Sequence, residues 1–299
     1  MSERIQIIKN RYEICMEGYE LNLVPEKILC NAGCVYCTLS KTDLEGITEE
    51  SNLIDVDELS GKLSELEQKR VYVGSNGDFF LQDTDISYDV LETLLEEGFP
   101  IMMITKGRIS DEIISLLAKH AKNNPESVVP QISLPSLNEE RTKLVEPGSA
   151  SVEDRLSNVK RLVDVGLEYT TLISIPFFPG IDDNYQDLKE LVSKGAELGV
   201  KYFKFAYVVM PEEKFDSLRK NDQLDKSLRL MTEDTRILIG KGKTADYKHR
   251  VETFENLKKI FNQFPNLKWG VCGPVLDPKM QGNEQGIPIC DNFKEFYGF

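Results

Sequence analysis

Short runs rich in β-branched and aromatic residues alternate with amphipathic segments between residues 19 and 210, and this alternation constrains the fold more than any other feature. Strands that alternate with helices form right-handed βαβ units and build a parallel sheet. We predict strands at 19–24, 70–73, 101–105, 128–134, 169–178 and 202–209, and helices at 55–68, 88–97, 110–122, 152–165 and 185–198. Six such units indicate an α/β fold, an open or partial (β/α)6 barrel with its chemistry at the C-terminal ends of the strands.

The chain outside this alternation has a different composition. After Met210 the alternation stops: residues 211–250 are highly charged, a helix is predicted at 251–264, and the tail is rich in Gly, Pro and Asn. We therefore expect an N-terminal extension at 1–18, a core at 19–210 and a C-terminal extension at 211–299. The C-terminal extension is expected to act as a lid or in substrate recognition.

The first predicted strand leads into Cys30, Cys34 and Cys37, which form a CxxxCxxC pattern. Thiolates are good ligands for the iron of iron–sulfur clusters. Three cysteines leave one iron of a four-iron cluster without a protein ligand, so a substrate or cofactor can bind there.

The main alternative is a structural zinc site in a non-catalytic binding module, which needs a fourth ligand. Cys272 or Cys290 could supply that ligand only if the fold brought them close to the motif, since both are far from it in the sequence. An electron-transfer protein is a further alternative, although ferredoxin-like patterns supply all four thiolates.

This pattern, with Tyr36 immediately before its last cysteine, resembles the signature of the radical SAM superfamily. The resemblance covers roughly residues 19–210, implies a TIM-like partial barrel, and is greatest to the spore photoproduct lyase-like branch. It implies a 4Fe–4S cluster held by the three cysteines, whose open iron binds S-adenosylmethionine (SAM). Reductive cleavage of SAM then gives a 5′-deoxyadenosyl radical that abstracts a hydrogen atom from the substrate. A reducing partner such as ferredoxin or flavodoxin is implied as well.

The resemblance also assigns SAM contacts at the ends of the later strands. Ser75 and Asp78 match a Ser-x-x-Asp arrangement that the branch has near the SAM amino group. Lys106 lies in a segment similar to the Thr-Lys-Ser of the branch, where a lysine pairs with the SAM carboxylate. Ser133 and Arg155 occupy positions that imply polar contacts to SAM. Tyr36, in the cysteine motif itself, completes the implied cofactor-binding set.

Each of these residues also has a structural interpretation. The segment with Ser75 can be an Asn-Gly turn, Lys106 an exposed loop lysine, and Ser133 a structural strand serine. Glu146 and Arg155 form either a buried ion pair that braces their loop or a direct contact to SAM.

Three further cysteines lie outside the motif, at Cys15, Cys272 and Cys290. They fall short of the four thiolates of an auxiliary cluster, so no second cluster is expected. In the enzyme that names the branch, a cysteine returns a hydrogen atom to the substrate radical. Cys272 and Cys290 are candidates for that role, and burial as small apolar side chains is the alternative.

Composition limits the partners. The formal net charge of −14 disfavours non-specific nucleic-acid binding, so DNA photoproduct repair rests on the resemblance alone. No apolar run is long enough to cross a bilayer and no signal peptide is evident, so we expect a cytoplasmic protein. The substrate stays open among peptides, nucleosides and small molecules.

Overall fold

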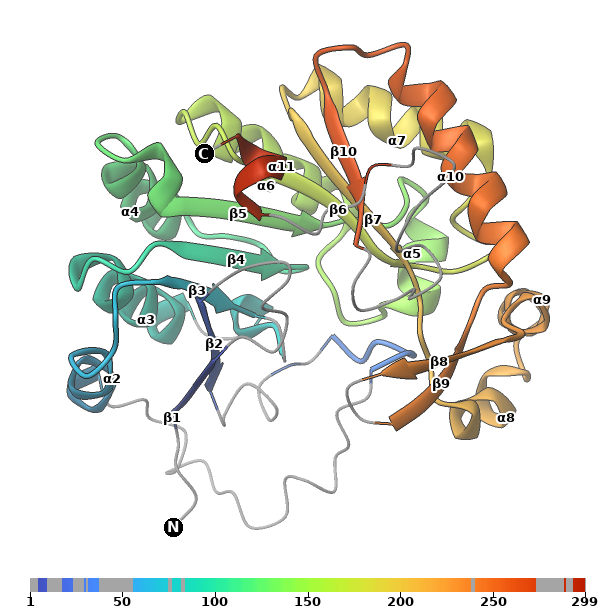
Figure 1. The fold of residues 1–299 in the computed structure, drawn as a ribbon, viewed down its shortest axis with the longest axis horizontal. Coiled ribbons are helices and arrows are strands. Elements are labelled where there is room, and N and C mark those ends of the chain that lie inside the picture. The colour runs from blue at the N-terminus through green and yellow to red at the C-terminus, as the bar shows by residue number, and fades with distance from the viewer. Residues whose placement is uncertain are drawn as a thin grey trace.

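In the computed structural model, the described part of the chain comprises residues 5–9, 18–23, 30, 32–37, 56–74, 77–81, 84–237, 240–272, 288 and 293–298. Eight strands of this part form one sheet in the order β1-β2-β3-β4-β5-β6-β7-β10 (Figure 1). The strands are β1 Ile5–Lys9, β2 Gly18–Leu23, β3 Arg70–Val73, β4 Ile101–Thr105, β5 Val128–Ser133, β6 Thr171–Phe177, β7 Tyr202–Tyr207 and β10 Lys268–Val271. Strands β2 to β7 and β10 are parallel to one another, and β1 runs antiparallel to β2.

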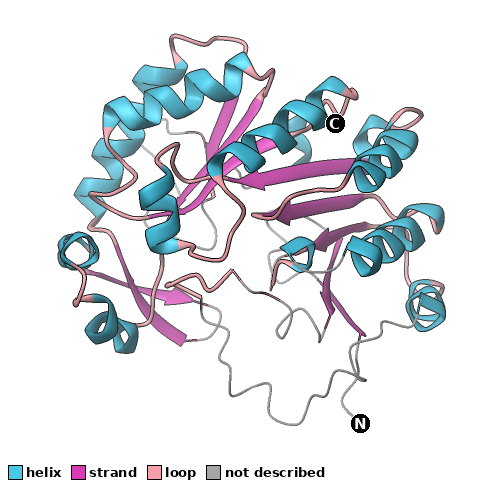
Figure 2. Cartoon of the chain, turned by 180° about the vertical axis from the view of Figure 1, so that it is seen from behind, coloured by secondary structure: helices cyan, strands magenta, loops and turns pink. Residues whose placement is uncertain are grey.

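The helices between the strands cover one face of the sheet, as the view from behind shows (Figure 2). They are α2 Val56–Leu63, α3 Thr84–Glu96, α4 Asp111–Ala121, α5 Glu139–Val145, α6 Val152–Asp164, α7 Tyr185–Glu197 and α10 Tyr247–Phe261. The main hydrophobic core lies between this helical layer and the sheet. Local sequence sets the helix ends: Ser151 accepts a hydrogen bond from the N–H of Asp154 at the start of α6, as expected of an N-cap serine.

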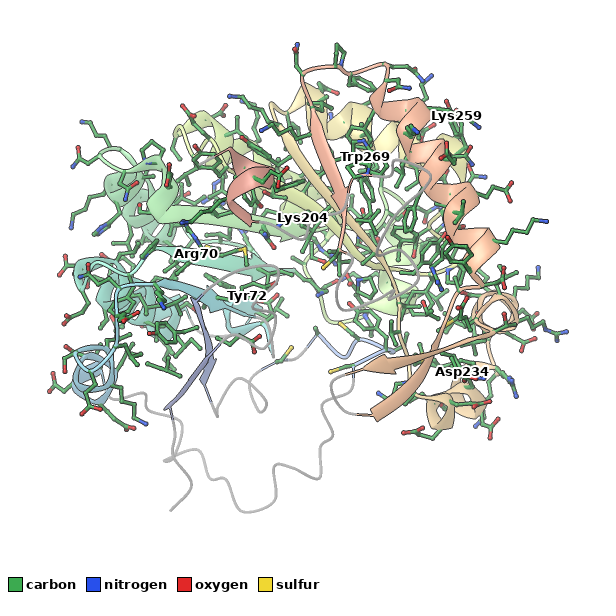
Figure 3. All side chains as sticks on the ribbon, viewed as in Figure 1. Arg70, Tyr72, Lys204, Asp234, Lys259 and Trp269 are labelled. Carbon is green, nitrogen blue, oxygen red and sulfur yellow. The ribbon has the colours of Figure 1, made fainter. Side chains whose placement is uncertain are left out.

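The short C-terminal helix α11, Phe293–Tyr297, packs on the opposite, open face of the sheet. The hydroxyl of Tyr297 bonds to Gln131 of β5 at 3.2 Å and to Thr171 of β6 at 2.8 Å. The ammonium of Lys204 on β7 lies 5.0 and 4.9 Å from the ring centroids of Phe296 and Tyr297 (Figure 3). Aromatic side chains from the end of the chain therefore fill this part of the open face.

The six predicted strands and their parallel arrangement are confirmed, and the α/β partial barrel with them. The expectation that the alternation stops after Met210 is wrong. Helix α10 and strand β10 continue it, and β10 adds a seventh parallel strand beside β7. Sequence reasoning missed this strand because its four residues, Lys268–Val271, give too short a run to show a strand period.

Residues 211–246 contain helices α8 Phe215–Leu218 and α9 Asp222–Leu230, and an antiparallel pair of strands, β8 Glu233–Ile237 and β9 Gly240–Thr244. Strand β9 is tied to the end of the core, where Met210 and Lys243 exchange two backbone hydrogen bonds of 3.0 and 2.8 Å. No helix in the described ranges has both the length and the apolar character needed to span a bilayer.

Candidate active site

The three motif cysteines lie in a loop that we call the cysteine loop (residues 30 and 32–37). Two backbone hydrogen bonds hold it against the end of α5 and the segment that follows: the N–H of Val35 donates to the carbonyl of Val145 at 3.0 Å, and the N–H of Gly148 donates to the carbonyl of Ala32 at 2.8 Å. The loop is therefore positioned by the chain that follows β5.

Cys30, Cys34 and Cys37 are all free thiols and all half-buried. Burial raises the pKa of the Cys34 thiol to about 11, while the positive charge of Lys106 opposes the rise. Binding to iron would replace the thiol proton, because a metal ion stabilises the thiolate.

Within the described ranges, no three His, Cys, Asp or Glu side chains converge as the ligands of one metal ion do. An iron–sulfur cluster does not require such convergence, because each cysteine binds a different iron atom. Three free thiols in one loop therefore fit the donor set of a cluster with one open iron.

Glu146 connects the cysteine loop to the rest of the site. Its Oε1 accepts a hydrogen bond from the hydroxyl of Tyr36 at 2.6 Å, and its Oε2 accepts one from Arg155 at 2.7 Å. The side chains of Glu146 and Arg155 are both fully buried. Burial, and then the charge of Glu146, raise the pKa of Tyr36, so this hydroxyl stays protonated and donates a hydrogen bond to the carboxylate.

The ammonium of Lys106 lies 4.0 Å from Oε1 of Glu146. Burial alone would lower the pKa of Lys106, but its acidic neighbours, Glu146 foremost, outweigh burial and raise the pKa. Lys106 is therefore a positive charge that faces the cysteine loop, and it is not the exposed loop lysine of the structural interpretation.

Arg155 makes several contacts within the protein. Besides Glu146, it donates to the carbonyls of Ser133 at 2.8 Å and Ala150 at 3.0 Å, and to the hydroxyl of Ser149. The buried ion pair that was one of two expectations for Arg155 is present. The contact of Arg155 with SAM stays a prediction.

Asp78 braces the end of β4. Its carboxylate accepts hydrogen bonds from the hydroxyl of Thr105 at 2.8 Å and from the backbone N–H groups of Lys106 at 2.5 Å and Phe80 at 3.2 Å. Burial raises the pKa of Asp78 and these hydrogen bonds oppose the rise. The segment that carries Lys106 is thus fixed by Asp78. Ser75, the other half of this predicted pair, lies outside the described residues.

Two of the remaining candidates can be placed. The hydroxyl of Ser133 donates to the carbonyl of Ile175 at 3.3 Å, so it joins β5 to the end of β6. Cys272 follows β10 and its N–H donates to the carbonyl of Phe205 at 2.9 Å, which places it at the C-terminal end of that strand. Cys15 and Cys290 lie outside the described residues.

Residues 29–194 match the family model described as the radical SAM superfamily, which is more than half of the chain. This chain belongs to the radical SAM superfamily. It is therefore an enzyme of a superfamily that uses a 4Fe–4S cluster and SAM and that needs a reductant. A comparison with curated protein sequences gives no match.

Solved structures of radical SAM enzymes share the fold. SuiB of Streptococcus suis bound to S-adenosylmethionine has a TM-score of 0.57 at 15% sequence identity, over 83% of this chain and 49% of SuiB. A mutant of spore photoproduct lyase with bound AdoMet and dinucleoside spore photoproduct has a TM-score of 0.56 at 15% identity, over 79% of this chain and 72% of that enzyme. This radical SAM chain thus spans about half the length of SuiB.

One contact to the cysteine loop of this radical SAM chain had no signal in the sequence. The ammonium of Lys214 donates to the backbone carbonyl of Cys37, although the two residues are 177 positions apart. Lys214 lies beyond the residues that match the family model, in a region that sequence analysis described only as charged.

Proposed function

We propose that Cys30, Cys34 and Cys37 of this chain hold a 4Fe–4S cluster, and that SAM binds beside it to initiate hydrogen-atom abstraction from an organic substrate. The bound cluster and SAM would supply, on one-electron reduction, a 5′-deoxyadenosyl radical. One observation carries the proposal. Tyr36 of the cysteine loop donates a hydrogen bond to the buried carboxylate of Glu146, and the ammonium of Lys106 lies beside the same carboxylate.

The residues around the loop have distinct tasks in this proposal. Lys106 provides a positive charge for the carboxylate of SAM, and Asp78 keeps the backbone of Lys106 in place. Arg155 forms an ion pair with Glu146 and so holds in place the carboxylate to which Tyr36 of the loop is bonded. Ser75 and Ser133 complete the polar contacts to SAM, and Arg155 reaches SAM only if its pair with Glu146 rearranges.

Hydrogen return and substrate recognition are assigned to the C-terminal region. Cys272 is a candidate hydrogen donor because it follows the C-terminal end of β10. The cysteine loop follows the C-terminal end of β2, which runs in the same direction in the same sheet. Cys290 is proposed on sequence alone. Residues 211–299 are proposed to contribute to substrate recognition, and a ferredoxin or flavodoxin to supply the electron.

The proposal is tested by anaerobic reconstitution with iron and sulfide, followed by reduction in the presence of SAM. We expect about four iron atoms per chain and reduction-dependent release of 5′-deoxyadenosine. Cys34→Ala should lose the cluster and the product, whereas Cys272→Ala should keep the cluster. Stoichiometric zinc with no iron after reconstitution would support the zinc-stabilised binding module instead.

A further inference from the structure

A part of the chain outside the family match lies against the cysteine loop. We call residues 211–237 and 240–246 the cap segment; it contains α8, α9, β8 and β9, and it lies beside the loop (Figure 1). Phe215, Leu228 and Met231 of the cap segment belong to one buried apolar cluster, and Val35 and Tyr36 of the loop pack against that cluster. Core residues such as Val145 and Phe178 belong to the same cluster, so the loop, the cap segment and the core share one apolar cluster.

Lys214 extends from the cap segment to the loop. Its ammonium donates to the carbonyl of Cys37, one of the three proposed cluster ligands, and the contact is partly buried. The backbone N–H of Lys214 donates to the carbonyl of Pro211 at 3.2 Å, and the neighbouring Met210 is tied to Lys243 of β9. The ammonium is thus held at the loop by a segment that is itself bonded to the core.

We propose that the ammonium of Lys214 raises the reduction potential of the cluster in this chain. The inference rests on the proposed function, since it requires a cluster at the cysteine loop. Reduction adds negative charge to the cluster, and a fixed positive charge nearby stabilises the reduced form relative to the oxidised form. Because the contact of Lys214 with Cys37 is partly buried, the interaction is screened less than it would be between fully exposed charges.

The charge balance of the chain makes such a cation relevant. The whole chain carries a formal net charge of −14, which by itself disfavours the addition of an electron. The carboxylates nearest to Lys214 in sequence, Glu212 and Glu213, are both exposed, so solvent screens their charge. The carboxylate of Glu146 is already compensated by Arg155 at 2.7 Å. Lys214 adds a second positive charge near the loop, besides Lys106, from a part of the chain outside the family match.

The experiment is a potentiometric titration of the reconstituted full chain, followed by the EPR signal of the reduced cluster. The set comprises wild type, Lys214→Met, Lys214→Gln, Lys214→Arg and the control Lys220→Met. Lys220 is an exposed lysine of the same cap segment. At the potential that reduces half of the wild-type cluster, the ratio of reduced to oxidised cluster should fall about tenfold in both neutral variants, a shift of about 59 mV. Lys214→Arg and Lys220→Met should titrate as wild type.

Three results would overturn the inference. If Lys214→Met or Lys214→Gln holds a full cluster at the wild-type potential, the charge of Lys214 does not act on the cluster. If both neutral variants lose their iron and Lys214→Arg keeps it, Lys214 serves to hold the loop and not to tune it. If the wild-type chain itself holds no iron–sulfur cluster, the proposed function fails and this inference fails with it. Only the first two results leave the proposed function intact.

Discussion

The hydroxyl of Tyr36 lies 2.6 Å from Oε1 of Glu146 and joins the cysteine loop to the segment that follows α5. The two residues are 110 positions apart in sequence. The aromatic ring of the cysteine motif thus has a defined partner, and this partner also faces Lys106 and pairs with Arg155. The cysteine loop is held by a charged network as well as by its backbone hydrogen bonds.

Removing the hydroxyl should weaken the attachment of the loop. Tyr36→Phe keeps the ring and loses a hydrogen bond to a carboxylate, which is worth about 1.5–3 kcal/mol. We expect the free energy of unfolding of the metal-free protein to fall by about that amount in urea denaturation. Tyr185→Phe on α7 serves as control: the variant loses only a long, exposed hydrogen bond from Gln263 of 3.4 Å, so it should unfold nearly as wild type. Equal stability of Tyr36→Phe and wild type would contradict the prediction.

Breaking the buried ion pair should be more costly. Arg155→Met leaves the fully buried carboxylate of Glu146 without its closest positive charge, and such a loss costs about 3–5 kcal/mol. Adding Glu146→Gln to Arg155→Met should recover part of this loss, because the double variant no longer buries the carboxylate that Arg155 neutralised. Denaturation of the two single variants and the double variant measures the coupling. Additive losses would show that the two side chains act independently.

The stability of the protein should fall as pH rises because of Asp182. This carboxyl group follows β6 and is nearly inaccessible; its Oδ2 accepts a hydrogen bond from the N–H of Phe178 at 2.8 Å. Burial raises the pKa of Asp182 to about 7. In the unfolded chain its pKa is about 3.9, so the native state binds more protons between these values. The contribution is fully present below about pH 4 and is lost as pH rises to about 7, by up to about 4 kcal/mol.

Asp182→Asn tests this pH dependence. The amide resembles the protonated acid, so the variant should be more stable than wild type at pH 8, with the difference shrinking towards pH 4. Denaturation of the metal-free proteins across this range provides the measurement. The control is Asp216→Asn, because the side chain of Asp216 is exposed. The neighbouring Asp183 is unsuitable because it is bonded to His249. A constant difference at all pH values would show that Asp182 does not titrate in this range.

Lys106 should contribute to the binding of SAM. Lys106→Met removes a charge-assisted contact to the SAM carboxylate, worth about 1.5–3 kcal/mol, which corresponds to roughly 10- to 150-fold weaker binding. Calorimetric titration of the reconstituted protein with SAM measures the change. Lys119→Met on the outer surface of α4 should bind SAM as wild type. Unchanged affinity in Lys106→Met would remove this residue from the proposed SAM site.

The core of the fold followed from the sequence because its signals are local. Each predicted strand is a short apolar run between helical segments, and α6 begins at Val152, the first residue of the helix predicted at 152–165. Strand β10 was missed because it is short and its place in the sheet is set only by its pairing with β7. The N-terminal strand β1 was missed too, and its pairing with β2 is likewise a tertiary contact.

The sequence by itself determined the chemical class of this protein. The spacing of Cys30, Cys34 and Cys37 is a local property, and it identifies a loop suited to a cluster without reference to the rest of the chain. Only the tertiary structure decided what surrounds that loop. Glu146 and Lys214 reach it from 110 and 177 residues away through hydrogen bonds, and a local pattern carries no information about such partners.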